Sequence, residues 1–225
     1  TGFETFNQSA LKRLGDGANK KAITTADLNE LMKAGRLQEM IPEGKAPSIA
    51  FIQCVGSRNQ KLDRNYCSQV CCKISLRQAN KLLYLYPEAD ISVFHMDLQI
   101  IGKEFRSFAE ALSGRVNLVQ GVAAEIVSER QEGKATLFHE DESTGVRTAY
   151  HFDLVVLSVG LGASEKAGEL ALKLGVKPGA WGFLSHSADA LPSGVYAAGA
   201  ASGPMNIVSA IERGRIAADK ISGEL

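Results

Sequence analysis

The sequence predicts a protein of the α/β class, and three observations lead to that prediction. From Ser48 to about Glu140, short apolar runs alternate with helical patterns in the order strand, helix, strand, helix, strand. Such alternation is typical of a parallel sheet with right-handed crossovers. After Glu125 the pattern changes to three short strands, which indicates a β-meander. A last apolar run, from Asp153 to Gly160, predicts one more strand that is buried on both faces.

The first 47 residues are polar and rich in loops. Thr24 to Asp27 resembles a capping box, which predicts a helix that begins there and ends at Gly35. Pro42, Gly44 and Pro47 then predict a linker. No residue here points to chemistry.

The central part supplies the alternating elements. Gln69 is expected to begin a helix with Ser68 as its N-cap, and Pro87 lies just past its end. A second helix is expected from about Lys103. The strands are predicted at residues 49–53, 91–95, 116–119, 125–129, 135–140 and 147–152, and a turn at 141–145 joins the last two.

The C-terminal part contains two further predicted helices. The first runs from Ala163 to Leu174 and is followed by Gly175. A strand near residues 195–198 then enters a glycine-containing loop, and a helix extends from about Pro204 to Ser222. The apolar positions expected to face the core from that helix are Ile207, Ala210, Ile211 and Ala218.

Composition excludes several classes of protein. The formal net charge is zero and the pI is about 6.8, so no basic surface for nucleic acid or anionic membranes is expected. No apolar run approaches the roughly 20 residues that cross a bilayer, so we expect no membrane insertion. Clustered thiols are typical of a reducing compartment, and we expect the protein in the cytoplasm.

All four cysteines lie in one stretch, with the spacing C-x12-C-x3-C-C. Cys54 follows the first strand, and Cys67 and Cys71 are expected one turn apart at the start of the helix, with Cys72 rotated by about 100°. A helix N-terminus favours anionic thiolates. Four soft ligands suit an iron–sulfur cluster or zinc, although the adjacent pair fits a zinc knuckle poorly. A redox disulfide between Cys71 and Cys72, or four buried small side chains, are the remaining readings.

The loop after the first strand lacks a dinucleotide fingerprint. A G-x-G-x-x-G loop would let the backbone approach a pyrophosphate, but residues 54–59 contain one glycine, Gly56. We therefore expect no binding of a pyridine nucleotide, and a metal centre in its place.

The sequence F-I-Q-C-V-G-S-R at 51–58, followed by Y-C-S-x-V-C-C at 66–72, resembles the signature of the A subunit of heterodisulfide reductase. Relatives of that subunit include the flavin subunits of the quinone-interacting membrane-bound oxidoreductase. The resemblance extends from about Ser48 to the C-terminus, and more weakly before it. It implies that Cys54, Cys67, Cys71 and Cys72 hold a [4Fe-4S] cluster beside an FAD.

The resemblance also implies a domain plan. Residues 48–150 form a degenerate nucleotide-binding-like domain with a β-meander, which carries the cysteines and is inserted in a partial FAD-binding Rossmann-like domain. Residues 1–47 hold the end of the first half of the flavin domain and a linker, and residues 151–225 hold its C-terminal half. The chain starts like the middle of a longer protein, so on its own we expect it to be inactive, and either cluster or flavin can be absent from it.

The flavin contacts implied by the resemblance are Gly160, Gly199, Ala200, Met205, Asn206 and Ile207. Amides at the start of the last helix would face the flavin and stabilise its anionic reduced form. Gly199-Ala200 departs from the Gly-Asp of most related flavoproteins, whose acid holds a ribityl hydroxyl. Lys103 and Arg58 are candidates for tuning the potential of flavin or cluster.

The function implied is electron transfer between FAD and a [4Fe-4S] cluster in a heterodisulfide-reductase-like oxidoreductase. The expected partners are other oxidoreductase subunits that donate or accept electrons through iron–sulfur centres. Two alternatives remain: an interaction domain stabilised by zinc, and a flavin disulfide oxidoreductase that uses Cys71 and Cys72.

Overall fold

A computed structural model describes residues 2–7, 14, 21–100, 102–127, 133–141, 144–179, 181–184, 191–192 and 194–224. The contacts divide the chain into two compact units. We call residues 7–55 and 71–159 the sheet unit, and residues 1–6, 56–70 and 160–225 the tail unit. The domain boundaries at 47 and 150 come from the family resemblance and stay a prediction.

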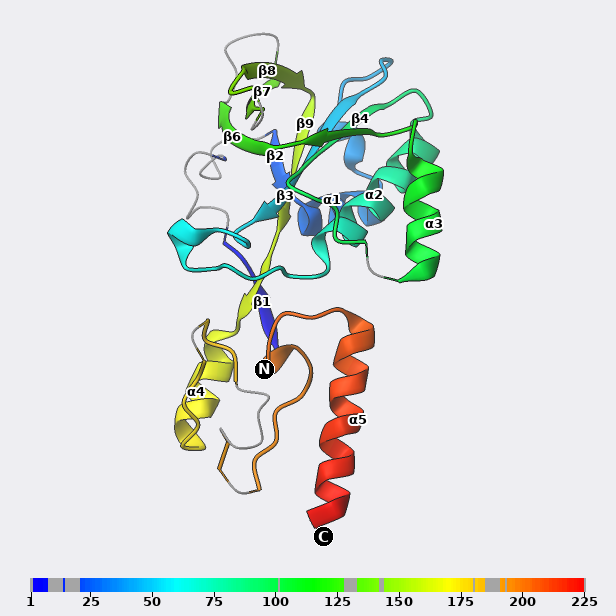
Figure 1. Cartoon of the computed structure of the whole chain (residues 1–225). Coiled ribbons are helices and arrows are strands. Elements are labelled where there is room, and N and C mark those ends of the chain that lie inside the picture. Colours follow the sequence, from blue (N-terminus) through cyan, green and yellow to red (C-terminus); the bar gives the residue numbers. More distant parts are fainter. Residues whose placement is uncertain are drawn as a thin grey trace. The chain divides into compact units, whose positions relative to one another are not determined.

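The sheet unit is built on a five-stranded sheet whose paired strands are all parallel. Its order is β2 (Ala22–Thr24), β9 (Leu154–Val159), β3 (Ser48–Val55), β4 (Asp90–His95) and β5 (Asn117–Gln120), as Figure 1 shows. Every residue of β9 is buried, as expected for a strand covered on both faces. The predicted α/β fold with a parallel sheet is confirmed.

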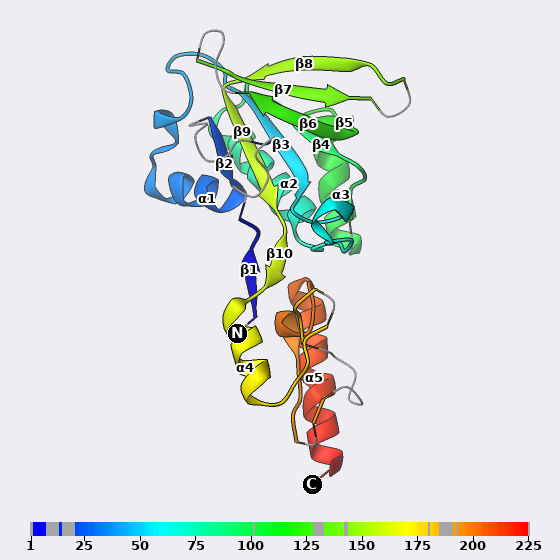
Figure 2. The ribbon, with the colours of Figure 1, turned by 90° about the vertical axis from the view of Figure 1, so that its left-hand side faces the viewer.

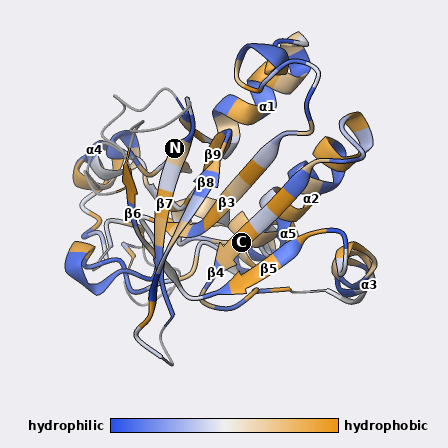
Figure 3. Ribbon diagram, turned by 90° about the horizontal axis from the view of Figure 1, so that it is seen from above, coloured by the Kyte–Doolittle hydropathy of each residue, from blue (hydrophilic) through white to orange (hydrophobic). Residues whose placement is uncertain are grey.

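Three helices cover one face of this sheet. They are α1 (Thr25–Ala34), α2 (Cys71–Leu85) and α3 (Lys103–Leu112), and their apolar residues share one core with Ile49 and Phe51 of β3. Each helix carries both hydrophobic and hydrophilic residues, orange and blue in Figure 3, as surface helices do. The predicted capping box of α1 is present between Thr24 and Asp27, and Gly35 ends the helix in the left-handed conformation. A short 3-10 helix, η3 (Leu37–Glu39), follows.

The opposite face of the sheet meets the β-meander. The meander consists of β6 (Val122–Val127), β7 (Ala135–Glu140) and β8 (Arg147–Phe152), paired antiparallel (Figure 2). Phe94 of β4 packs edge-on against Tyr150 and Phe152, with ring centroids 5.3 and 5.9 Å apart. Alternation along β4 explains this contact, because Val93 faces the helices and its neighbour Phe94 faces the other way.

The tail unit contains a small antiparallel pair, β1 (Phe3–Thr5) with β10 (Leu161–Ala163). Its helical elements are η4 (Gln60–Leu62), α4 (Glu165–Lys173), η6 (Gly199–Ala201) and α5 (Ile207–Glu224). The predicted strand near residues 195–198 is wrong, because no strand forms there before η6. None of the helices in the described ranges is both long and apolar enough to cross a membrane.

Two sequence predictions about helices need correction. Helix α2 begins at Cys71 rather than Gln69, because Gln69 adopts a left-handed conformation with φ 62°. Ser68 is not its N-cap: the Ser68 hydroxyl accepts a hydrogen bond from the Leu161 amide at 2.8 Å, within the tail unit. The hydroxyl is therefore used to fasten residues 56–70 to β10.

The predicted core positions of α5 are also wrong. Ile207 is 78% exposed and Ile211 is 53% exposed, while Ala218 is exposed and Ala210 is half-buried. An apolar pattern of helical period shows which face of a helix avoids water, but it does not show that the described chain covers that face.

Candidate functional site

Cys54 lies at the carboxyl end of β3, where the strand is irregular. The pairing of β3 with β9 shifts register between Ile52 and Val55. Cys54 itself has φ 59°, a conformation that side chains other than glycine rarely adopt. A bulge of this kind re-aims a side chain at the edge of a sheet, where ligands bind in open α/β folds.

Cys71 and Cys72 are the first two residues of α2, and both thiols are buried. The Cys71 Sγ donates to the carbonyl of Val159 at 3.5 Å. One turn further along α2, the Ser75 and Ser158 hydroxyls share a hydrogen bond of 2.6 Å between α2 and β9. The first turn of α2 thus lies over the carboxyl end of β9, and its exposed N–H groups favour negative charge there.

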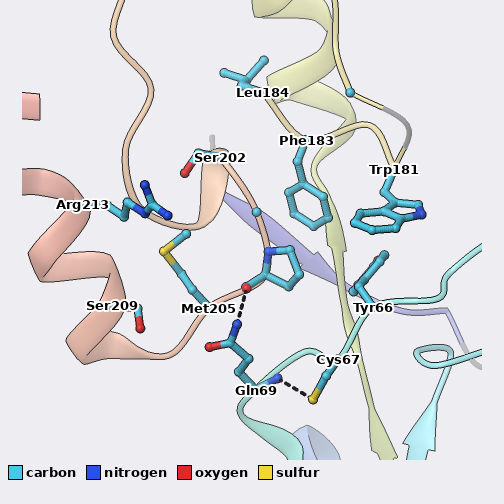
Figure 4. Close-up of a pocket in the computed structure, with 13 residues that line it drawn as sticks. Tyr66, Cys67, Gln69, Trp181, Phe183, Leu184, Ser202, Met205, Ser209 and Arg213 are labelled. Atoms are coloured by element: carbon cyan, nitrogen blue, oxygen red, sulfur yellow. Dashed lines mark hydrogen bonds between the residues drawn. The ribbon is translucent and has the colours of Figure 1, made fainter. Parts of the chain in front are cut away.

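Cys67 belongs to the tail unit. Its sulfur accepts a hydrogen bond from the Gln69 amide at 3.3 Å and lines a cavity of about 610 Å³ (Figure 4). The prediction that Cys67 and Cys71 lie one turn apart on the same helix is wrong, because Cys67 precedes the start of α2 by four residues.

The four thiols are therefore distributed over both units: three in the sheet unit and Cys67 in the tail unit. None of them forms a disulfide. Within the described ranges, no three His, Cys, Asp or Glu side chains form a group that could hold a metal ion. The assignment of the four cysteines as ligands of one centre stays a prediction.

Aromatic side chains form one wall of the cavity beside Cys67. Tyr66 packs against Trp181 and Phe183, with ring centroids 5.0 and 5.8 Å apart (Figure 4). The Tyr66 hydroxyl donates to the Leu161 carbonyl at 2.8 Å. Burial raises the pKa of Tyr66, and nearby Arg64 opposes that effect. The phenol is therefore protonated at neutral pH and acts as a fixed hydrogen-bond donor.

The segments predicted to contact a flavin lie in the tail unit. A Cβ at Gly160 would lie 2.8 Å from the Ser68 Oγ and 2.9 Å from the Ser57 Cβ, so only glycine fits. Gly199 opens η6 with φ 62°, and Ala200 follows it within η6. The remaining three residues, at the start of α5, are described next.

Met205 lines the same cavity as Cys67. The Asn206 Oδ1 accepts from the Ser209 amide at 3.0 Å and so caps α5, whose first residue is Ile207. A helix beginning near Pro204 is thus confirmed within three residues, and the amides of its first turn have no intrahelical acceptor. No residue of these segments is shown to bind a flavin, and the contacts stay a prediction.

The two candidate tuning residues are placed differently. Lys103 is the first residue of α3, but its side chain lies outside the described part of the structure. Arg58 has φ 52°, and its amide donates to the Tyr66 carbonyl at 2.9 Å. Arg58 is therefore fixed through its backbone within residues 56–70.

The structure brings forward two glutamines that the cysteine motif alone does not single out. The Gln69 Nε2 donates to the Pro204 carbonyl at 3.3 Å, and its Oε1 accepts from Asn206 at 3.5 Å. Gln53, beside Cys54, is 7% exposed although it is polar. The signal for Gln53 was an amide inside an otherwise apolar strand, where burial is costly.

Two similar solved structures define the fold class of the chain. The thioredoxin reductase of T. acidophilum matches with a TM-score of 0.63 and 15% identity, over 100% of this chain and 64% of that one. The thioredoxin reductase of Lactococcus lactis matches with a TM-score of 0.60 and 16% identity, over 98% and 62%. The chain therefore has a thioredoxin-reductase-like fold. No protein-family model matches it.

Sequence comparison identifies the particular relatives. The chain is 30% identical to the A subunit of the H(2):CoB-CoM heterodisulfide,ferredoxin reductase of Methanothermobacter marburgensis, over 100% of its own length. It is 32% identical over 99% to the A subunit of the H(2)/formate:CoB-CoM heterodisulfide,ferredoxin reductase of Methanococcus maripaludis. It is 30% identical over 100% to the second iron-sulfur A subunit of the CoB--CoM heterodisulfide reductase of Methanopyrus kandleri.

The chain is thus homologous over its whole length to the A subunits of heterodisulfide reductases, which confirms the resemblance drawn from the cysteine motif. These relatives are named as subunits of reductases, which are oxidoreductases. The chain spans 36 to 37% of their length.

Proposed function

We propose that the chain is part of an electron-transfer subunit of a heterodisulfide-reductase-like oxidoreductase, in which electrons pass between FAD and a [4Fe-4S] cluster. Cys54, Cys67, Cys71 and Cys72 are the proposed cluster ligands. The observation that carries the proposal is the confinement of all four thiols to one motif, in a chain homologous throughout to these reductase subunits. One of those relatives is itself named an iron-sulfur subunit.

The chemistry of the donor set fits a [4Fe-4S] cluster. Four thiolates are the usual ligands of such a cluster, and none of these thiols is consumed in a disulfide. Two of them occupy the first turn of α2, where backbone N–H groups stabilise an anionic centre. Because Cys67 belongs to the tail unit, the proposal requires cluster binding to bring the thiols of both units together.

The chain's own residues would position and tune the centre. When bound, the cluster would supply one-electron transfer. The Cys71 thiol already contacts the Val159 carbonyl, so its sulfur is held at the carboxyl end of β9. The Gln69 amide donates to the Cys67 sulfur, and such N–H···S bonds favour the anionic form of a ligand.

The tail unit offers the groups proposed to meet a flavin. Gly160 lies where a side chain does not fit, and Met205 and Asn206 stand at the start of α5. FAD would supply the step between two-electron and one-electron chemistry. The free N–H groups at the start of α5 would face its anionic reduced form. Ala200 provides no carboxylate for a ribityl hydroxyl, so this contact of other flavoproteins is absent.

The test is metal and sulfide analysis of the full chain purified without oxygen, followed by EPR after reduction. We expect iron and acid-labile sulfide in equal amounts and a signal that appears on reduction. Stoichiometric zinc without visible absorbance would instead support the zinc-stabilised interaction domain. Thiol-dependent charge-transfer absorbance in the presence of flavin, without iron, would support a disulfide oxidoreductase that uses Cys71 and Cys72.

The proposed partners follow from the relatives, which are named as subunits of heterodisulfide and ferredoxin reductases. We propose that iron–sulfur proteins donate electrons to this subunit or accept them from it, in the cytoplasm.

A further inference from the structure

Gln53 is a buried amide whose hydrogen bonds are not made by the described residues. The residue is 7% exposed, and neither its Nε2 nor its Oε1 has a partner among them. Buried carboxamides are normally hydrogen-bonded, so each exception needs an explanation. A leucine of similar size would fill the same space without burying polar atoms, so packing alone does not account for glutamine here.

The polar groups near Gln53 are already engaged. Ser75 and Ser158, both fully buried, share the hydrogen bond of 2.6 Å described above. Gln78, also buried, uses its Nε2 to donate to the Thr25 carbonyl at 2.7 Å. Gln53 therefore differs from Gln78 in having an N–H donor group that no described residue accepts from.

The strand geometry places Gln53 beside the first turn of α2. Ile49 and Phe51 of β3 face the helical layer, and alternation along the strand turns Gln53 to the same side. Helix α2 covers that side, and its first residues are Cys71 and Cys72. Cys54, the third thiol of the sheet unit, is the next residue along β3. The unmade donor thus lies at the end of the sheet that carries three of the four proposed ligands.

We propose that Gln53 is a positioning residue whose side-chain N–H group donates to a sulfur atom of the metal–sulfur centre. This inference rests on the proposed function and deepens it, because it names a residue that sets the potential of the centre. A hydrogen bond to sulfur stabilises the more negative, reduced form of a cluster and so raises its reduction potential. Gln53 would then favour acceptance of an electron at this site.

The main test compares Gln53→Leu with the wild-type chain after anaerobic reconstitution with iron and sulfide. The readout is the midpoint potential from an EPR-monitored redox titration, which does not depend on enzyme activity. We expect the variant to bind iron and sulfide and to show a more negative potential. At the wild-type midpoint its ratio of reduced to oxidised cluster should fall about tenfold, which corresponds to 59 mV.

Gln78→Leu is the matched control, because it removes a buried amide of the same size from the body of α2. Its midpoint potential should equal that of the wild type. An unchanged potential in Gln53→Leu, or an equal shift in both variants, would overturn the proposal.

A second measurement covers the case in which Gln53→Leu does not fold. Wild-type chain labelled with ¹⁵N in the glutamine side-chain amides is reconstituted, reduced and studied by pulsed EPR. We expect a ¹⁵N coupling to the cluster, which the Gln53→Leu variant should lack if it folds. Absence of the coupling in the wild type overturns the role of Gln53 alone. A wild-type chain that takes up no iron or sulfide overturns the proposed function as well, so the two failures are distinguishable.

Discussion

The side-chain amide of Gln69 donates a hydrogen bond to the carbonyl of Pro204, 3.3 Å away. Gln69 follows Cys67 by two residues, and Pro204 stands just before the start of α5. This contact, with the weaker one between Gln69 and Asn206, joins the segment that carries a proposed cluster ligand to the segment proposed to face a flavin.

Replacing Gln69 by alanine should loosen this link. We expect a loss of about 1 kcal/mol in the free energy of unfolding, since one neutral hydrogen bond is removed. Amide hydrogen exchange at residues 205–210 should become faster, because Asn206 loses a neighbour at the cap of α5. Exposed Gln60 offers the control: Gln60→Ala should leave both quantities unchanged. Equal exchange rates in all three proteins would show that the link has no effect.

Gly56, inside the cysteine motif, is fixed by both backbone and space. Its φ is 76°, and a Cβ added to it would overlap the ring of Phe6. We expect Gly56→Ala to lower the free energy of unfolding by about 3 kcal/mol or more, measured by urea denaturation followed by circular dichroism. Gly114 has φ 87° but nothing within 4 Å of its Cβ position, so Gly114→Ala should cost only about 1 kcal/mol. Similar losses in the two variants would mean that the Phe6 contact contributes nothing.

Asp153 holds the start of β3 and should make stability depend on pH. Burial alone would raise the pKa of Asp153, but hydrogen bonds from the amide and hydroxyl of Ser48, with Lys134 at 3.5 Å, hold it below the ordinary value of 3.8. A carboxyl whose pKa is lowered by folding stabilises the fold above its unfolded value, and that contribution disappears as pH falls through the folded value.

Asp153→Asn should therefore lower the free energy of unfolding at pH 7 by about 2 kcal/mol. The difference from the wild type should narrow below pH 3.8, where the wild-type carboxyl takes up a proton. Urea denaturation at several pH values measures it. Asp219→Asn, an exposed aspartate on α5, should behave like the wild type throughout. A difference that stays constant down to pH 3 would contradict this account of Asp153.

The sheet unit should not bind a pyridine nucleotide. In a dinucleotide-binding fold a glycine-rich loop leads directly from the first strand into the helix. Here β3 ends at Val55, and residues 56–70 leave for the tail unit before α2 begins at Cys71. Isothermal titration calorimetry with NADH or NADPH should show no micromolar binding. Measurable micromolar binding would mean that the nucleotide site is retained.

The sequence was sufficient for the elements whose signals are local. Alternating apolar runs predicted the parallel strands, and Thr24 with Asp27 predicted the cap of α1. Signals that depend on distant partners failed. Ser68 has the chemistry of an N-cap, yet its hydroxyl is used by the Leu161 amide, 93 residues away. The apolar positions of α5 predicted a buried face, but nothing in a helical period says where the covering residues come from.

The candidate site was predicted in its composition but not in its arrangement. The thiols and their neighbours could be found from spacing. That Cys67 is grouped with the tail unit, and the other three thiols with the sheet unit, follows from the left-handed turns at Cys54 and Gln69, which no propensity predicts. Gln53 could be located by its polarity, but only the packing around it shows that its amide lacks a partner within the described residues.

The most direct test of the central claim is the iron and sulfide content of four single variants, Cys54→Ser, Cys67→Ser, Cys71→Ser and Cys72→Ser, beside the wild type. All are prepared and reconstituted without oxygen. We expect about four irons and four sulfides per wild-type chain and a loss of the intact [4Fe-4S] signal in every variant. Zinc in place of iron in the wild type, or a full cluster signal in any one variant, would contradict the claim that these four thiolates hold one centre.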